Sequence, residues 1–135
     1  MTARVLIVDD DETLLELFEL ALAGPGREVV GCASTDLALE LLAREPFAVV
    51  LTDLHMPGLA GHEFCRRVAA AYPDTPVVVM TAHAGAEVAI AALRAGARDC
   101  LSKPLQLELT RLRLERLVEE HHTRAELRRL RAAGA

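Results

Sequence analysis

Val49-Val50-Leu51-Thr52-Asp53 is the stretch that decides the fold. It begins with branched apolar residues and shows no polar alternation, which is typical of a parallel strand covered by helices on both faces. Met56-Pro57-Gly58 breaks regular structure soon afterwards, so Asp53 is expected at the carboxyl end of a central strand. Ligands of open α/β sheets bind at this edge. An aspartate that stands alone there is more often a helix cap or a turn former, so Asp53 indicates a site only if other polar groups join it.

Composition narrows the class of protein. The chain has 135 residues, of which 52% are hydrophobic and 26% are charged, as expected for one globular domain. The net charge of −5 is uneven, because residues 1–110 carry 8 Lys/Arg and 16 Asp/Glu whereas residues 111–135 carry 7 Arg and 4 Glu. The acidic body argues against direct nucleic-acid binding, and a mildly basic tail does not restore it.

The cysteines and the N-terminal sequence indicate the cellular compartment, and a pair of histidines raises the separate question of a metal site. Cys32, Cys65 and Cys100 are odd in number, widely spaced and outside any CxxC motif, which favours reduced, buried thiols. His121 and His122 are adjacent and so point in different directions on a helix; we interpret them as solvated rather than metal-binding. The start has no basic-then-apolar leader, and no apolar run approaches the length of a membrane span. We therefore expect a cytoplasmic protein without membrane contact.

Apolar runs and breakers predict strands and helices in alternation. Strands are expected at 4–8, 28–32, 47–53, 76–81 and 98–102. Helices are expected at 14–22, 36–43, 61–72, 86–95 and 107–130. Ser34 or Thr35 can cap the second helix. Alternation of this kind predicts an α/β fold with a parallel sheet and right-handed crossovers.

The last predicted helix divides into two halves. The first offers apolar residues to dock on the sheet, namely Leu109, Leu112, Leu114, Leu117 and Val118. Farther on, the apolar positions thin to Ala125, Leu127 and Leu130 among charges, so docking does not need the second half. We expect it to project as a connector, with a frayed tail as the alternative. Accordingly, we divide the chain into one domain at 1–120 and a helical extension at 121–135.

Polar side chains end four of the five predicted strands: Asp9 and Asp10, Asp53, Thr81, and Lys103. Each alone could be a cap or a turn residue, but chance explains all four poorly. Three crowded carboxylates need a cation, and oxygen-only ligands favour a hard divalent ion, with Mg²⁺ as the default. A carboxylate beside Mg²⁺, a lysine and a hydroxyl suits phosphoryl transfer: the aspartate attacks, the cations neutralise phosphoryl oxygens, and the hydroxyl donates to one of them.

Four motifs carry a resemblance to a known family: Val8-Asp9-Asp10-Asp11, Leu51-Thr52-Asp53-Leu54-His55-Met56-Pro57-Gly58, Met80-Thr81-Ala82 and Leu101-Ser102-Lys103-Pro104. Together they resemble the receiver domain of bacterial two-component response regulators over about residues 3–120. The resemblance implies a flavodoxin-like, doubly wound sheet of five parallel strands in the order 2-1-3-4-5, with an extended C-terminal helix. It also implies a signalling module that is not an enzyme beyond self-phosphorylation and slow autodephosphorylation.

The same resemblance implies roles for residues. Asp53 would accept a phosphoryl group from a histidine kinase, and Thr81 and Lys103 would contact that group. The expected Mg²⁺ ligands are Asp9, Asp10, Asp53 and the backbone carbonyl of His55. The Lys103–Pro104 peptide is expected to be cis, an isomer that an X-Pro bond allows.

Three departures from the family pattern concern four positions. Cys100 stands where an aromatic residue is usual, so a conformational relay must run through Thr81 and the helix that follows it. His55 and His83 border the expected phosphoryl site; they are either solvated loop residues or groups that tune the phosphate lifetime by blocking or positioning water. Leu105 replaces a common phenylalanine, which is a mild change.

The sequence constrains the output that the receiver controls less than it constrains the phosphoryl chemistry. Thr81-Ala82-His83 and the Arg/Glu-rich last helix resemble receivers of enhancer-binding transcription activators, in which that helix joins an ATPase domain. A missing output domain, transcriptional in role, is therefore expected. One alternative is a stand-alone receiver that acts by protein docking. Another is an Mg²⁺-dependent phosphatase with an aspartate nucleophile, although such enzymes usually place a second acid where this chain has His55.

A weak homodimer is also expected, through the face formed by the fourth helix, the fifth strand and the last helix. A helix that continues past its docking surface must find a partner or fray. Leu127 and Leu130 are spaced as an a/d pair, but sustained heptads do not extend them. We therefore expect micromolar or poorer association, modulated by phosphorylation through Thr81 and the loop at 82–85.

Overall fold

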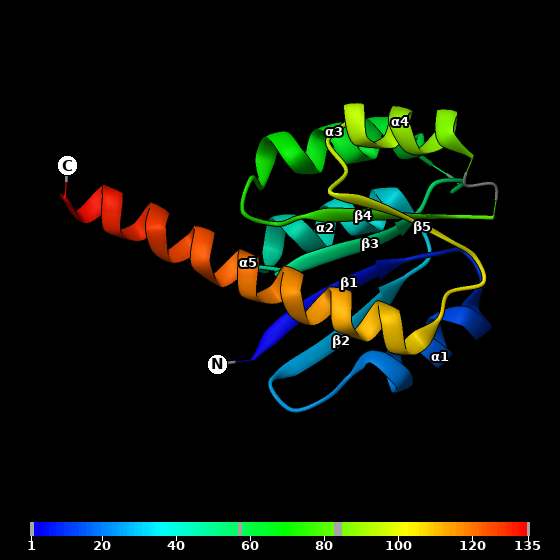
Figure 1. Cartoon of the computed structure of the whole chain (residues 1–135), viewed down its shortest axis with the longest axis horizontal. Helices are drawn as coiled ribbons and strands as arrows, with labels where there is room; N and C mark the ends of the chain where they lie inside the picture. Colours follow the sequence, from blue (N-terminus) through cyan, green and yellow to red (C-terminus); the bar gives the residue numbers. More distant parts are fainter. Residues whose placement is uncertain (1, 57, 83–84, 135) are drawn as a thin grey trace.

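The computed structural model describes residues 2–56, 58–82 and 85–134 and arranges them in three layers around a central sheet (Figure 1). The strands are β1 (Ala3–Val8), β2 (Arg27–Cys32), β3 (Val49–Asp53), β4 (Val77–Thr81) and β5 (Asp99–Ser102). The helices are α1 (Glu12–Leu22), α2 (Thr35–Arg44), α3 (Gly61–Ala71), α4 (Ala86–Arg94) and α5 (Leu107–Gly134). All strand pairs are parallel, in the order β2-β1-β3-β4-β5, which confirms the predicted fold class and strand order.

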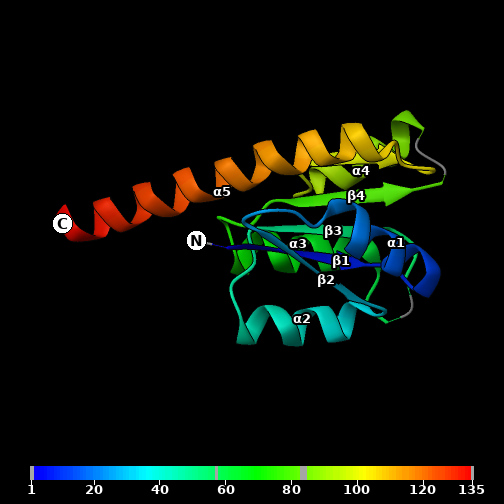
Figure 2. The same cartoon turned by 90° about the horizontal axis from the view of Figure 1, so that it is seen from below.

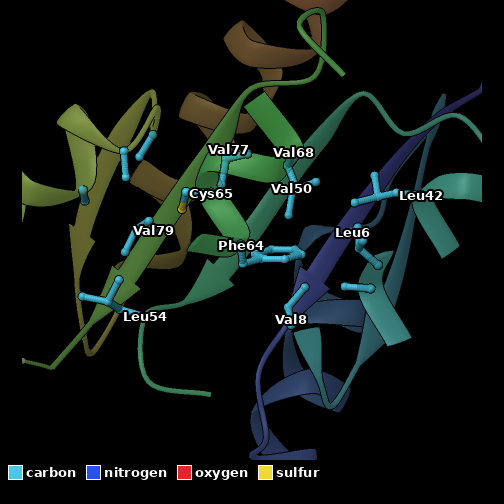
Figure 3. Close-up of a cluster of buried hydrophobic side chains, with 14 of the residues drawn as sticks. Leu6, Val8, Leu42, Val50, Leu54, Phe64, Cys65, Val68, Val77 and Val79 are labelled. Atoms are coloured by element: carbon cyan, nitrogen blue, oxygen red, sulfur yellow. The ribbon is translucent and has the colours of Figure 1, made fainter. Parts of the chain in front are cut away.

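Successive strand residues point to opposite faces of the sheet and so build two separate cores. One core packs the sheet against α2, α3 and α4, with Phe64 of α3 fully buried among Leu6, Val8 and Val50 of the strands (Figure 3). The other packs it against α1 and α5, through residues such as Phe18. Helices on both faces explain why the strands read as unbroken apolar runs.

Most elements differ from the prediction by one or two residues at a boundary, and the differences in β3 and α5 matter most for the fold. Strand β3 begins at Val49 rather than Phe47, whose buried side chain packs against the α2 and α3 layer instead. Helix α5 continues to Gly134, beyond the predicted end near Leu130, and Figure 2 shows its C-terminal half extending past the sheet. The second half of α5 thus extends past the sheet as predicted, whereas its role as a connector and the domain division at residue 120 stay predictions.

The predicted docking face of α5 is partly wrong. Leu114 and Leu117 are buried as expected, but Leu109 and Leu112 are 45% and 53% exposed. The inward residues are spaced four and then three apart starting from Thr110, which is the period of one helix face. Because this helix has apolar residues on two faces, counting them could not identify the face that meets the sheet.

The predicted state of the cysteines agrees with the structure in most respects. Within the described part of the chain Cys32, Cys65 and Cys100 carry free thiols, with Cys32 and Cys65 buried and Cys100 half-buried. Burial raises the pKa of the Cys32 and Cys65 thiols to about 11, which keeps them protonated and unreactive at neutral pH. Among the described residues, none of the helices has both the length and the apolar character needed to cross a membrane.

Candidate functional site

Strand register brings the predicted site residues to one edge of the sheet. Val8 pairs with Thr52, so Asp9 follows β1 at the level where Asp53 ends β3. Thr81 pairs with Ser102, which puts Lys103 one residue beyond the last residue of β4. The backbone N–H of Lys103 donates to the carbonyl of Thr81 at 2.9 Å and ties the two strand ends together. These side chains therefore meet because parallel strands share a carboxyl edge.

Lys103 lies between two carboxylates. Its Nζ is 2.7 Å from Asp9 Oδ2 and 2.6 Å from Asp53 Oδ2. Burial alone would lower the pKa of Lys103, but hydrogen bonds to Asp53 and Asp9 outweigh it and hold the pKa above the ordinary 10.5. The ammonium is therefore charged at every physiological pH and reaches both acids at once.

Backbone amides fix the other oxygen of each paired carboxylate. The N–H of Asp11 donates to Asp9 Oδ1 at 2.9 Å, and the N–H of His55 donates to Asp53 Oδ1 at 2.9 Å. Asp9 is fully buried, whereas Asp53 keeps 8% of its surface exposed. Asp53 is thus held rigidly yet lies within reach of a molecule approaching from solvent.

Asp10 completes an acidic group at this edge. Carboxylate oxygens of Asp9, Asp10 and Asp53 lie within 4.8 Å of one another, and Asp10 is exposed. Three carboxylates with one ammonium leave two uncompensated negative charges, so the donor set fits a hard divalent cation. The role of the His55 carbonyl as a further ligand stays a prediction, and the side chain of His55 is exposed.

The remaining predictions for the site concern Thr81, the Lys103–Pro104 peptide, the Pro57-Gly58 pair and His83. Thr81 is fully buried at the end of β4, and the Lys103–Pro104 peptide is cis, as predicted. Gly58 adopts φ 96°, a left-handed conformation that explains the glycine after Asp53. The predictions for Pro57 and His83 lie outside the described residues.

Two supports of the site, from Asp11 and Thr35, were missed by sequence reasoning, whereas the predicted cap of α2 by Ser34 or Thr35 is confirmed for Ser34. Asp11 caps α1, since its side chain accepts from Leu14 N at 3.2 Å. Ser34 caps α2, whereas Thr35 donates from Oγ1 to the carbonyl of Leu59 at 3.1 Å and props the loop after β3. Spacing carries no signal for a contact between residues 24 positions apart. The supported loop borders a hollow of about 490 Å³, lined by Asp10, Leu54, His55, Met56, Ala60, Gly61 and His62.

Comparison with known proteins places this geometry in a family. The family model described as "Response regulator receiver domain" matches residues 5–115. The chain is 42% identical over 106 residues to the response regulator protein FleR of Pseudomonas aeruginosa, covering 78% of this chain and 22% of that protein. It is 36% identical over 135 residues to the regulatory protein AtoC of Escherichia coli K12, covering 98% of this chain and 29% of that protein.

Solved structures agree. A CheY-like receiver domain protein from Methanospirillum hungatei has a TM-score of 0.85 at 26% identity, covering 92% of this chain and 99% of that one. The beryllofluoride-activated NtrC4 receiver domain dimer has a TM-score of 0.81 at 29% identity, covering 87% and 98%. The chain spans less than a third of FleR and AtoC, so their whole-protein activities are not transferred here. The motifs, the strand order and the family match together show that the chain belongs to the response regulator receiver domain family.

Proposed function

We propose that this protein is a phosphoacceptor in a two-component system, with Asp53 receiving a phosphoryl group from a phosphohistidine of a histidine kinase. The observation that carries the proposal is Lys103, whose ammonium contacts Asp53 and the buried Asp9 simultaneously. An Asp53 oxygen attacks phosphorus, the phosphorus–nitrogen bond of the donor breaks, and the departing imidazole nitrogen takes a proton from solvent. Lys103 then neutralises charge on the transferred group, and the Thr81 hydroxyl donates to it.

Asp9, Asp10, Asp53 and the carbonyl of His55 would hold Mg²⁺, which supplies further positive charge to the phosphoryl oxygens. The backbone amide that holds Asp53 Oδ1 would orient the nucleophile, leaving Oδ2 to exchange its contact with Lys103 for the phosphorus. Apart from self-phosphorylation and slow autodephosphorylation, no turnover is proposed. A cytoplasmic location likewise stays a prediction.

We assign the output to transcription control through a domain beyond this chain. The support is similarity to full-length regulators, including the DNA-binding transcriptional regulator NtrC of Escherichia coli K12, at 32% identity over 130 residues and 28% of its length. A stand-alone receiver that docks on a partner is the alternative. Sequencing the gene on the 3′ side of the codon for residue 135 distinguishes the two: an output domain encoded there supports the proposal, and a stop codon favours the stand-alone receiver.

A homodimer through α4, β5 and α5 is part of the proposal. Four large apolar side chains of α4 and α5 are about half exposed: Ile90, Leu93, Leu109 and Leu112. Burying such side chains in a contact is favourable, at about 25 cal/mol per Å² of apolar surface. The structure of the beryllofluoride-activated NtrC4 receiver domain, which is a dimer, adds support by similarity.

Incubation with acetyl phosphate and Mg²⁺ tests the activity. We expect one acid-labile phosphoryl group per chain, no uptake by the Asp53→Asn variant, and no uptake after chelation. Turnover of a phosphomonoester would instead favour the phosphatase alternative. Uptake that survives both the substitution and chelation would refute the proposal.

A further inference from the structure

The second half of α5 contacts the opposite edge of the sheet from Asp53, at the turn between α3 and β4. Arg128 donates from Nε to Asp74 Oδ2 at 2.7 Å and from a terminal nitrogen to Asp74 Oδ1 at 3.1 Å. Two parallel hydrogen bonds fix the orientation of the guanidinium relative to the carboxylate, whereas a single hydrogen bond leaves it free to rotate. The contact joins residues 54 positions apart, so it is tertiary rather than helical.

His121 makes a second contact with the same turn. Its Nδ1 lies 2.6 Å from the backbone carbonyl of Asp74. A carbonyl only accepts, so the imidazole donates from Nδ1 in both its neutral and its charged form. The prediction that His121 is merely solvated is therefore wrong, whereas His122 is exposed as predicted.

The turn that receives these contacts is itself anchored. The N–H of Thr75 donates to the carbonyl of Tyr72 at 2.9 Å and closes the turn. The Thr75 hydroxyl, which is buried, donates to the carbonyl of Phe47 at 2.8 Å and attaches the turn to the segment before β3. Asp74 thus stands on a rigid base, with its side chain 20% exposed.

Helix geometry explains why the contacts fall on this side of α5. His121 and Arg128 are seven residues apart and share a face. The same face carries the buried Leu117 one turn before His121 and the buried Leu114 two turns before it. The inward face therefore changes from apolar to polar where the sheet ends and the turn begins. Leu127 and Leu130 lie off this face and are 47% and 52% exposed.

We propose that the α3–β4 turn is a docking site for the chain's own α5 extension, a latch of Asp74 with His121 and Arg128 that fixes the direction in which α5 leaves the receiver. The latch presents Leu127 and Leu130 outward, where a partner helix can reach them without displacing it. Arg98, just before β5, adds a third tie through Glu120 at 3.3 Å. This inference does not depend on phosphorylation of Asp53.

The latch is expected to stay closed at neutral pH and to weaken in salt. Hydrogen bonds from Arg128 hold the pKa of Asp74 below its ordinary 3.8, so the carboxylate is charged throughout the physiological range. The basic side chains that face Asp74 are those of His121, Arg124 and Arg128. Because the Arg128 side chain is 63% exposed, salt at about 1 M, where the Debye length is about 3 Å, should screen the pair.

Hydrogen exchange of the full chain tests the latch with a matched pair of variants. Arg128→Ala and Arg129→Ala both replace an exposed arginine by a better helix former. Among the described residues, however, Arg129 pairs within α5, with Glu126. We expect amides of residues 121–134 to exchange about two- to fivefold faster in Arg128→Ala and in Asp74→Asn, as suits an ion pair at the strong end of the exposed range. Arg129→Ala should leave them unchanged.

Amides of β3 and α3 serve as an internal reference and should not change in any of these variants. The double variant D74R/R128D, which reverses the pair, should restore protection that each single charge reversal removes. Equal exchange in Arg128→Ala and Arg129→Ala would overturn the latch. So would faster exchange spread over the whole domain in Asp74→Asn, because Asp74 would then stabilise the receiver rather than the extension.

Discussion

At the carboxyl edge of the sheet, Lys103 joins Asp9 and Asp53 with side chains that are 22%, 1% and 12% exposed. At the amino edge, Arg128 joins Asp74 with side chains that are 63% and 20% exposed. Both are aspartate–cation contacts shorter than 3 Å, but their surroundings differ. Breaking a buried pair by removing one partner typically costs about 3–5 kcal/mol, whereas an exposed pair contributes about 0–1 kcal/mol.

This difference separates chemistry from positioning. Withdrawing two carboxylates and an ammonium from water costs free energy that apolar packing at the same place would not cost. Such an arrangement is expected where the charged groups have a task that apolar side chains cannot perform. Binding a cation and a phosphoryl group is such a task. An exposed pair costs little to form or break, which suits a contact that sets the direction of a helix.

The sharpest way to break the comparison is to remove each cation in turn. Lys103→Ala should slow phosphoryl uptake from acetyl phosphate by about 100- to 1000-fold, the usual effect of losing one charge-stabilising donor. Arg128→Ala should leave the uptake rate unchanged. Quench-flow kinetics with mass spectrometry of the intact protein measures both uptake rates, and circular dichroism shows whether each variant is folded. Equal rates in the two variants would show that the two edges do not differ as described.

Added Mg²⁺ should stabilise the carboxyl edge alone. At a concentration 100 times the dissociation constant, linkage predicts about 2.7 kcal/mol of additional stability. Asp10→Asn should reduce that gain and should stabilise the metal-free protein, because it relieves repulsion among the three acids. Thermal melts with and without millimolar Mg²⁺ measure the gain, with Asp74→Asn as the control that retains it. A melting curve indifferent to Mg²⁺ counts against the site.

Matched threonines at the two edges sharpen the comparison further. Thr35 donates to the carbonyl of Leu59 at 3.1 Å, and Thr75 donates to that of Phe47 at 2.8 Å; both are buried. Replacement of either by valine should cost about 1–3 kcal/mol, because a buried carbonyl loses its partner. Only Thr35→Val should also slow phosphoryl uptake, since it loosens the loop beside Asp53. Denaturant unfolding measures the loss of stability in each variant, and phosphoryl uptake rates show whether the site is affected. Equal slowing of uptake by Thr35→Val and Thr75→Val would contradict the role of Thr35 in supporting the loop beside Asp53.

The smallest expected effect is on association. A chain that ends at Glu120 lacks Leu127, Leu130 and the latch, and it should dimerise more weakly by about tenfold, or 1.4 kcal/mol. Phosphodonor should strengthen association of the full chain through the face that carries Leu112. Sedimentation of both chains, with and without phosphodonor, measures this. Equal monomer fractions in all four samples would make the extension a passive linker.

Sequence reasoning reached the carboxyl edge because the rules that govern it are local. An apolar run predicts a buried parallel strand, and parallel strands end at one edge of a sheet. The sequence alone therefore predicts that Asp9, Asp53 and Lys103 lie close together, as the strand order confirms. The Lys103–Pro104 cis peptide followed from the family resemblance.

The amino edge could not be predicted in the same way. The Asp74–Arg128 contact depends on where a turn and the end of a long helix meet in space, which no periodicity encodes. For Leu109 and Leu112 the difficulty was phase: α5 has apolar residues on two faces, and only packing selects the inward one. Both failures concern tertiary geometry rather than local preference.

The most direct test of the account is to locate the phosphoryl group in the intact chain. Borohydride reduces an aspartyl phosphate to homoserine, which peptide mass spectrometry identifies by position. After treatment with acetyl phosphate and Mg²⁺, we expect homoserine at residue 53 and at none of the other aspartates. Homoserine at position 9 or 10, or a phosphoryl group on a histidine with Asp53 unmodified, would contradict it.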